Sequence, residues 1–251
     1  MKSCLTLIGL ALLSVCASGQ VSAVGTPIKL HIASGTSTGT SLAYTPTGNS
    51  NTVIIGGDLQ TAASGLTATD GTTSLTLGGT TPTANSRIQF VFTLCNLTNT
   101  THTAYAVNWT GSANGNFWLQ EYSGNTGGCN TTVTASSTTS GSTCSGAGCT
   151  SSAATTSDIS IVLDDANDWM VCLMSDGGNA MTMTVGNQRL NETNSPEGIL
   201  GDNTASSGAV HCTATIGSAI LRMLAVELRV SGNASAITLG PNMTVGGSIT
   251  F

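Results

Sequence analysis

The chain has 251 residues, of which only 7% are charged, whereas 30 are serine and 42 are threonine. Twelve acidic and six basic residues give a net charge of −6, and the basic residues are scattered along the sequence. Nucleic-acid binding needs clustered Lys and Arg that neutralise phosphates, so this composition argues against nucleic acid and against an anionic membrane surface as partners.

The first 23 residues have the pattern of an export leader. Met1-Lys2 gives a short positive start, Leu5 to Cys16 is apolar, and Val21-Ser22-Ala23 has the small-residue pattern that signal peptidase recognises. We therefore expect cleavage after Ala23 and a single secreted domain over residues 24–251. The apolar run is shorter than the roughly 20 residues of a transmembrane helix, and no later segment is longer or more apolar.

A second interpretation of the leader is lipidation at Cys16. Leu13-Ser14-Val15-Cys16 resembles the lipobox of bacterial lipoproteins, in which the cysteine becomes the lipidated N-terminus. That pattern has Gly, Ala or Ser before the cysteine, where this protein has Val15. The favoured interpretation is that Cys16 is an apolar residue of the leader.

Apolar and polar side chains alternate along the first half of the mature protein, which predicts β-strands because successive strand residues face opposite ways. Threonine, with its stiff β-branched side chain, suits such strands. The expected strands are 28–32, 53–55, 75–77 and 87–95. Tyr105 to Trp109 and Phe117 to Tyr122 repeat the pattern, and we expect them to form an aromatic hairpin around a loop at 111–116.

The second half of the sequence has the same β pattern. A strand is expected at 159–163, and the runs 169–174 and 180–185 flank Ser175-Asp176-Gly177-Gly178-Asn179, which predicts a hairpin turn. The segment 219–229 is compatible with a helix or a buried strand, and its second half favours a strand. Final strands are expected at 236–239, 243–245 and 248–251.

These elements predict an all-β protein folded as an antiparallel β-sandwich, Ig-like or jelly-roll-like, stabilised by disulfides and carrying long Ser/Thr/Gly-rich loops. The segment 131–156 consists almost wholly of Ser, Thr, Gly, Ala and Cys, so it cannot bury much apolar area. It is either a long loop or a boundary between two halves of the domain.

Six cysteines remain after the leader, an even number that permits complete pairing in an exported protein. Fifteen connectivities are possible, and spacing makes nearest-neighbour pairing the first expectation. A zinc site is disfavoured because the sequence has no C-x-x-C motif. The expected pairs are Cys144 with Cys149, Cys95 with Cys129, and Cys172 with Cys212.

Two groups of residues are candidates for ligand binding. Asp164, Asp165, Asn167 and Asp168 place four oxygen-bearing side chains within five residues, which makes calcium a possible ligand, although turn formation is the commoner role of such residues. Trp109, Trp118 and Tyr122 would offer flat apolar faces to sugar rings, with Asn108 and Asn116 as hydrogen-bonding groups. The alternative is that these aromatic residues lie in the core.

The favoured function is an extracellular structural or adhesive surface protein, with no catalytic role, that associates with itself or other surface proteins through strand edges. The final Ser248-Ile249-Thr250-Phe251 is similar in broad terms to the last strand of pilus subunits assembled by strand exchange. The expected contact residues are Ile28, Leu30 and Ile32 near one end of the sequence and Ile249 and Phe251 at the other. A carbohydrate-binding module is the first alternative. The second is a secreted glycoside hydrolase that uses the Asp164–Asp168 cluster or Glu121.

Overall fold

A computed structural model describes residues 20–60, 63–81, 86–97, 100–101, 103–125, 128–130, 138–140, 143–145, 154–163, 165, 167–176, 179–194, 197–204, 209–219 and 221–230. In these residues all regular structure is β, and sixteen strands form three sheets. The prediction of an all-β, disulfide-stabilised β-sandwich is confirmed, with a third sheet added to the two expected. The described part has no helix of the length and apolar character needed to cross a membrane.

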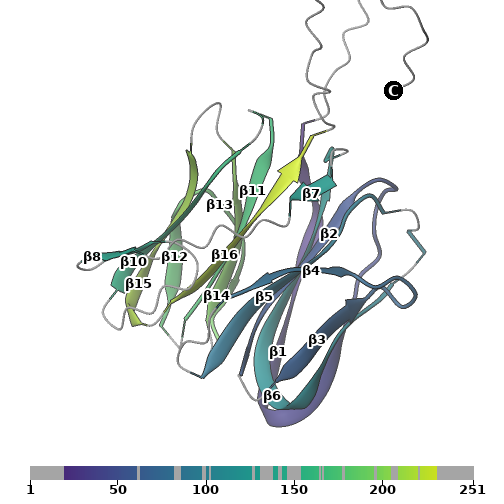
Figure 1. Ribbon diagram of the computed structural model, residues 1–251, viewed down its shortest axis with the longest axis horizontal. Helices are drawn as coiled ribbons and strands as arrows, with labels where there is room; N and C mark the ends of the chain where they lie inside the picture. The colour runs from purple at the N-terminus through teal and green to yellow at the C-terminus, as the bar shows by residue number, and fades with distance from the viewer. Residues whose placement is uncertain are drawn as a thin grey trace, which may run out of the picture.

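The first sheet is formed by the N-terminal half of the sequence, in the order β1-β6-β2-β5-β4, and β3 also pairs with β6 (Figure 1). All of its pairs are antiparallel. Its strands are β1 (Ser22–Ala43), β2 (Thr52–Gln60), β3 (Ser64–Thr69), β4 (Thr76–Thr80), β5 (Arg87–Leu94) and β6 (Ala104–Ser123).

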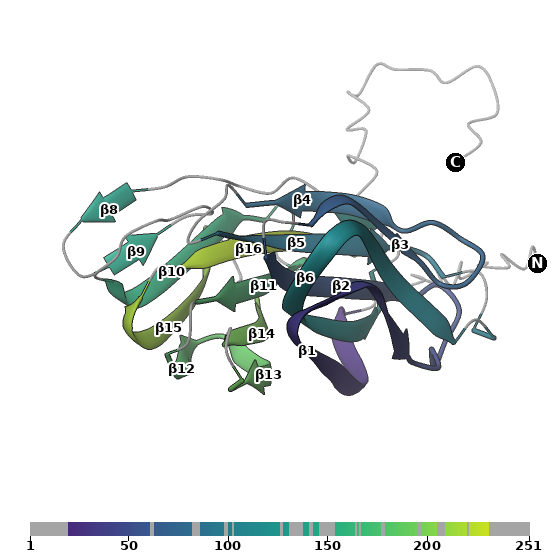
Figure 2. The same cartoon turned by 90° about the horizontal axis from the view of Figure 1, so that it is seen from below.

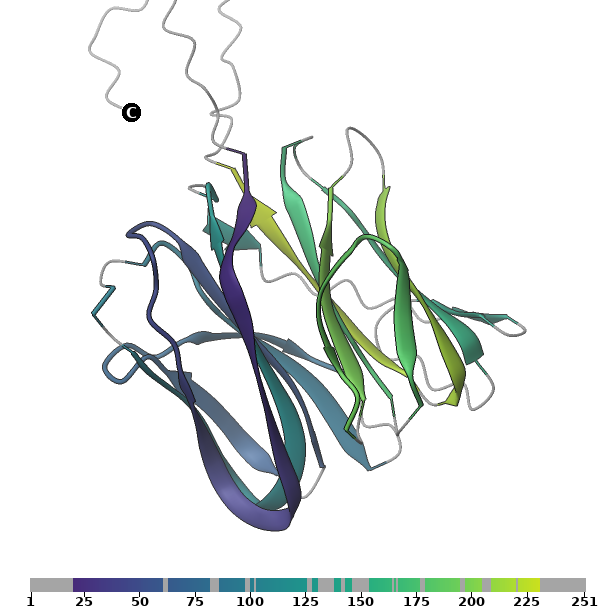
Figure 3. The ribbon, with the colours of Figure 1, turned by 180° about the vertical axis from the view of Figure 1, so that it is seen from behind.

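The two long strands of this sheet correct one expectation. Tyr105 to Trp109 and Phe117 to Tyr122 do not form a hairpin, because both runs belong to the single strand β6, which pairs with β1 from Ser22↔Ser123 to Ala43↔Ala104. Both strands curl around one core, as Figure 3 shows for β1. Gly111, with a φ of 90°, takes a left-handed conformation at the middle of β6, so the glycine that suggested a loop lies within a continuous strand.

The second and third sheets are formed by the rest of the described residues. The second has the order β13-β14-β11-β16-β7, and the third has the order β12-β15-β10-β9-β8. Only the pair β9–β10 is parallel among the described strands. The strands are β7 (Gly128–Asn130), β8 (Thr138–Ser140), β9 (Thr143–Ser145), β10 (Ala154–Val162), β11 (Trp169–Ser175), β12 (Met181–Val185), β13 (Asn187–Glu192), β14 (Gly198–Asn203), β15 (Ala209–Ala219) and β16 (Arg222–Arg229).

The expected hairpin around Ser175 to Asn179 is also wrong. β11 pairs with β14 and β16 in the second sheet, whereas β12 pairs with β15 in the third. The Asp176 carboxylate accepts hydrogen bonds from the N–H of Asn179 at 3.0 and 3.1 Å. The turn therefore leads from the second sheet to the third. The sequence pattern predicts a turn, but it does not show whether the strands on either side of the turn pair with each other.

The second sheet is the middle layer (Figures 1 and 2), and apolar side chains cover both of its faces. Along β11, Val171 and Leu173 pack toward the first sheet, whereas Cys172 and Met174 pack toward the third. This arrangement explains why the segment 219–229 was ambiguous in sequence. A strand buried on both faces reads as a continuous apolar run, as a buried helix does. Residues 222–229 of the segment form the strand β16, whereas Ala219 is the last residue of β15.

The segment 131–156 lies between the part of the sequence that forms the first sheet and the part that forms most of the other two. The two parts nevertheless share one core, in which Trp118 and Tyr122 of β6 pack with Leu224 and Val226 of β16. The first sheet has a further core of its own, which includes Val53, Phe90, Phe92, Tyr105 and Phe117.

Candidate functional site

The three aromatic residues predicted to bind glycans lie in the core. Trp118 and Tyr122 are fully buried against the second sheet, and Trp109, 5% exposed, stacks on Phe117 with ring centroids 5.6 Å apart. Asn108 is exposed, but its side chain faces the opposite side of β6 from that of Trp109 because strand residues alternate. A sugar platform needs an open ring face, and the described fold gives none of these three rings one, so their burial does not support the glycan-binding hypothesis.

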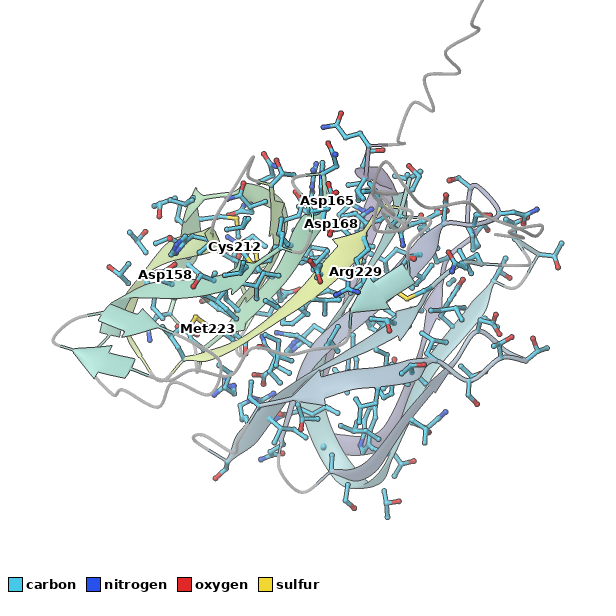
Figure 4. All side chains as sticks on the ribbon, turned by 45° about the horizontal axis from the view of Figure 1, so that its top comes forward. Asp158, Asp165, Asp168, Cys212, Met223 and Arg229 are labelled. Carbon is cyan, nitrogen blue, oxygen red and sulfur yellow. A yellow bond between two sulfur atoms is a disulfide. The ribbon has the colours of Figure 1, made fainter. Side chains whose placement is uncertain are left out.

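The residues predicted to bind calcium form a turn before β11, and Asp164 lies outside the described residues. The Asp165 carboxylate accepts hydrogen bonds from the main-chain N–H and side-chain amide of Asn167, at 2.8 and 3.0 Å. The Asp168 carboxylate accepts from the N–H of Asp165 at 3.0 Å and of Val230 at 2.9 Å. Figure 4 shows Asp165 and Asp168 together at the end of β16, near Arg229. These oxygens hold the turn to the last residue of the described fold.

Burial raises the pKa of the Asp168 carboxyl above its ordinary value, and this effect outweighs the two N–H donors that lower it.

A calcium site needs six to eight oxygen ligands. Within the described residues, no three His, Cys, Asp or Glu side chains are grouped so that they could hold a metal ion.

We therefore expect calcium to leave the thermal unfolding midpoint unchanged. If an ion did bind only the folded state, it would raise that midpoint by mass action. Calorimetry of the same preparation with calcium and with a chelator checks this. A midpoint that rises with calcium concentration would restore the calcium prediction.

Glu121, the other carboxylate considered for a hydrolase, is fully buried and binds the segment between β1 and β2. It accepts hydrogen bonds from the Tyr44 hydroxyl and the Asn51 amide, each at 2.6 Å, and from the Thr47 N–H at 3.0 Å. Burial, and after it this carboxylate, raise the pKa of Tyr44 well above its ordinary value. A general acid or base must reach its substrate, so neither Glu121 nor the Asp168 turn supports the hydrolase hypothesis.

Asp202 on β14 is a third buried carboxylate with a structural role. It accepts hydrogen bonds from Nε and Nη2 of Arg189 at 2.5 and 2.9 Å and from the Tyr122 hydroxyl at 3.1 Å. The Arg189 guanidinium also lies 5.9 Å from the ring centroid of Trp169, a cation–π geometry. The group therefore joins β13 and β14 to β6 of the first sheet.

A buried charge cluster that the sequence patterns did not predict lies between the first and second sheets. Asp58 on β2 is fully buried; it forms an ion pair with Arg87 of β5 and accepts a hydrogen bond from Nε of Arg222, on β16, at 2.6 Å. The Ser175 hydroxyl donates to the same Asp58 oxygen at 2.6 Å. Arg222 also donates to the main-chain oxygen of Asp176 at 2.8 Å. One carboxylate thus joins strands from both halves of the sequence.

Every charged residue that is buried as a whole in the described part of the fold has a hydrogen-bond or ion-pair partner, whereas the partly buried Glu197 has one buried carboxylate oxygen without a hydrogen-bond partner. The buried charges are therefore structural groups.

Two of the three expected disulfides are present. Cys95–Cys129 joins the residue after β5 to β7, and Cys172–Cys212 joins β11 of the second sheet to β15 of the third. Their Cα atoms are 6.0 and 6.5 Å apart. The expected partner of Cys144, Cys149, lies outside the described residues, so that pair stays a prediction. The disulfides are compatible with an extracellular protein.

The residues of β1 predicted for strand exchange are used within the fold. Ile28, Leu30 and Ile32 are partly buried and pack against the core of the first sheet. β1 is an edge strand, but its register shifts between Val24 and Ile28, and Pro27 lies in that irregularity. Bulges and proline are features that protect an edge from pairing with another molecule. Ile249 and Phe251 lie outside the described residues.

Side chains from neighbouring strands also form hydrogen bonds with main-chain groups at the edges of β13 and β12. Lys29 of β1 donates to the main-chain oxygen of Asn191 on β13 at 3.2 Å. On β12, the main-chain oxygen of Met181 accepts from the Asn191 amide at 2.9 Å, and the N–H of Met183 donates to Gln188 at 3.4 Å. The β1, β13 and β12 edges are therefore partly closed by contacts within the molecule.

The remaining outermost strands of the three sheets are short or partly covered, with β4 as the exception. Beside β3, the N–H of Leu75 donates to the oxygen of Ala68 at 2.9 Å, while β7 and β8 have three residues each. β4, which runs along one margin of the ribbon in Figure 2, pairs only with β5, and its sequence Thr-Leu-Gly-Gly-Thr carries no charge. Its Leu77 is 43% exposed, one of three exposed large apolar side chains in the described residues. We take the β4 edge as the candidate site.

Comparison of the sequence and structure with protein-family models, curated proteins and solved structures finds no match.

Proposed function

We propose that this protein is an extracellular structural or adhesive surface protein that acts by association, and that the edge of β4 is its contact with a second copy. The observation that carries the proposal is an uncharged edge with an exposed leucine, in a fold whose other outermost described strands are protected, partly covered or short. An unpaired strand edge presents a row of free N–H and C=O groups, which a strand of another molecule can satisfy.

The sequence of β4 favours a second copy as the partner. If two β4 strands pair antiparallel about Gly78, Thr76 of one copy lies opposite Thr80 of the other. Leu77 then lies opposite Gly79, which has no side chain to obstruct it. Cross-strand threonine pairs stabilise antiparallel sheets, and a two-fold contact uses the same patch on both subunits. The register shift between Leu77 and Gly79 is the one protective feature of this edge.

Replacing Leu77 with lysine should weaken self-association about tenfold, since it removes an apolar contact and places a positive charge from each copy near the two-fold axis. Sedimentation velocity over a concentration series measures the effect. The matched control is Val162→Lys, because Val162 is 73% exposed but lies in the third sheet, at the end of β10, where it pairs with Ala209 of β15. That variant should associate like the unmodified protein.

Equal weakening by both variants would indicate nonspecific apolar contact and would contradict the proposal, as would a protein that stays monomeric at high concentration. A filament needs a second contact beyond a two-fold pair. The C-terminal residues Ile249 and Phe251 remain the predicted residues for it. Deletion of residues 248–251 should then leave the β4 dimer intact while removing filaments in negative-stain micrographs.

A further inference from the structure

The fold begins before the cleavage point that the leader pattern first suggested. Val21 is fully buried, and it packs in the core between the first and second sheets together with Tyr122. β1 starts at Ser22, which pairs with Ser123, and the hydroxyls of these two serines are 3.0 Å apart. Ala23 pairs with Tyr122 and packs against the same core. Cleavage after Ala23 would remove all of these contacts.

Gln20 also contacts the body of the protein. A Cβ atom placed on Gly124 would lie only 2.3 Å from the main-chain oxygen of Gln20 and 3.2 Å from the Cα of Val21. Gly124 has a φ of 83°, which favours glycine. The turn after β6 therefore has a glycine at the point where the residues before β1 pass closest to it.

The sequence has an earlier site with the required pattern. Ala17-Ser18-Gly19 directly follows the apolar run, and both its first and its third residue are small. In Val21-Ser22-Ala23 the first residue is valine, and the third is small. We propose that the leader is cleaved after Gly19, an inference that rests on the proposed export of this protein. The mature protein then begins at Gln20 and keeps Val21 to Ala23 in the fold.

This cleavage has a chemical consequence for the new N-terminus. The freed α-amino nitrogen of Gln20 can attack the carbonyl carbon of its own side-chain amide. A new C–N bond then closes a five-membered lactam, the original C–N bond of the amide breaks, and ammonia leaves. The mature protein would then have an uncharged N-terminus where the main chain enters the first sheet.

The test is to express the full-length protein in a secreting host and to identify the N-terminal peptide of the exported product by mass spectrometry. A terminus at Gln20, with or without loss of one ammonia, is the expected result. A terminus at Val24, or a lipidated Cys16, would overturn the inference while leaving export intact. An uncleaved protein retained in the cell would instead contradict export itself.

A second measurement does not depend on the host. Proteins produced to begin at Gln20 and at Val24 should differ in thermal unfolding midpoint, with the shorter one less stable, and Val21→Ser in the longer protein should lower the midpoint as well. Gln20→Ser serves as the control and should leave the midpoint unchanged, because the Gln20 side chain is exposed. Equal midpoints for the two lengths would overturn the inference.

Discussion

Replacing Asp58 with alanine should lower the free energy of unfolding by about 3–5 kcal/mol, because it leaves two buried guanidinium groups without their shared carboxylate. Arg222 is fully buried and Arg87 is nearly so, so water cannot replace the lost partner. The Ser175 hydroxyl loses its acceptor in the same variant. Chemical denaturation followed by circular dichroism measures the change.

The matched control is Asp158→Ala, which removes the same side chain from an exposed pair. Asp158 on β10 accepts a hydrogen bond from Nδ1 of His211 on β15 at 3.0 Å, and both side chains are open to solvent. Exposed pairs contribute roughly 0–1 kcal/mol. If the two variants lost similar stability, the Asp58 cluster would not hold the sheets together as we describe.

Replacing both Cys172 and Cys212 with alanine should lower the free energy of unfolding by about 4 kcal/mol. The disulfide restricts the unfolded chain, and this value is the chain entropy that a loop of 40 residues regains when the crosslink is removed. Both cysteines are fully buried in the core between the second and third sheets, so the loss of packed sulfur atoms adds to this cost. The unfolding midpoint in denaturant, compared with that of the unmodified protein, gives the effect.

The pair Cys95–Cys129 provides the comparison, because its separation of 34 residues predicts nearly the same entropic contribution. Its cysteines are only partly buried. The Cys95/Cys129 double variant should therefore lose less stability than the Cys172/Cys212 one. The reverse order would show that packing around Cys172 contributes little.

Local alternation identified strands well but could not identify their partners. The pattern at 87–95 became β5, and 53–55 lies within β2. The two predicted hairpins failed because glycine, asparagine and aspartate mark a change of direction without specifying the strand that comes next. In β6 the strand runs on through Gly111, and after β11 the backbone crosses to another sheet. Pairing was decided by the long-range fit of apolar faces.

The buried charges left a trace in the sequence that local patterns do not capture. In a protein that is 7% charged, Asp58 and Arg222 each stand within an apolar run. Burial without a partner would be prohibitive for either residue, so each implied an opposite charge elsewhere in the core. The sequence does not show which residues pair, since Asp58 and Arg222 are separated by 164 positions. The β4 edge likewise can be identified only once the other outermost described strands are seen to be protected, partly covered or short.

The pairing of β1 with β6 has a consequence for how fast the protein can fold. Ala43 pairs with Ala104 and Ser22 with Ser123, so β1 cannot pair with β6 until a separation of 61 residues at one end and 101 at the other is closed. Closing so long a loop is entropically costly before any contact forms, and β-proteins rich in distant pairings fold on the order of milliseconds to seconds. During that interval the uncharged strands of a protein with few Lys or Glu residues are exposed to other molecules. We expect refolding yield to fall steeply with protein concentration.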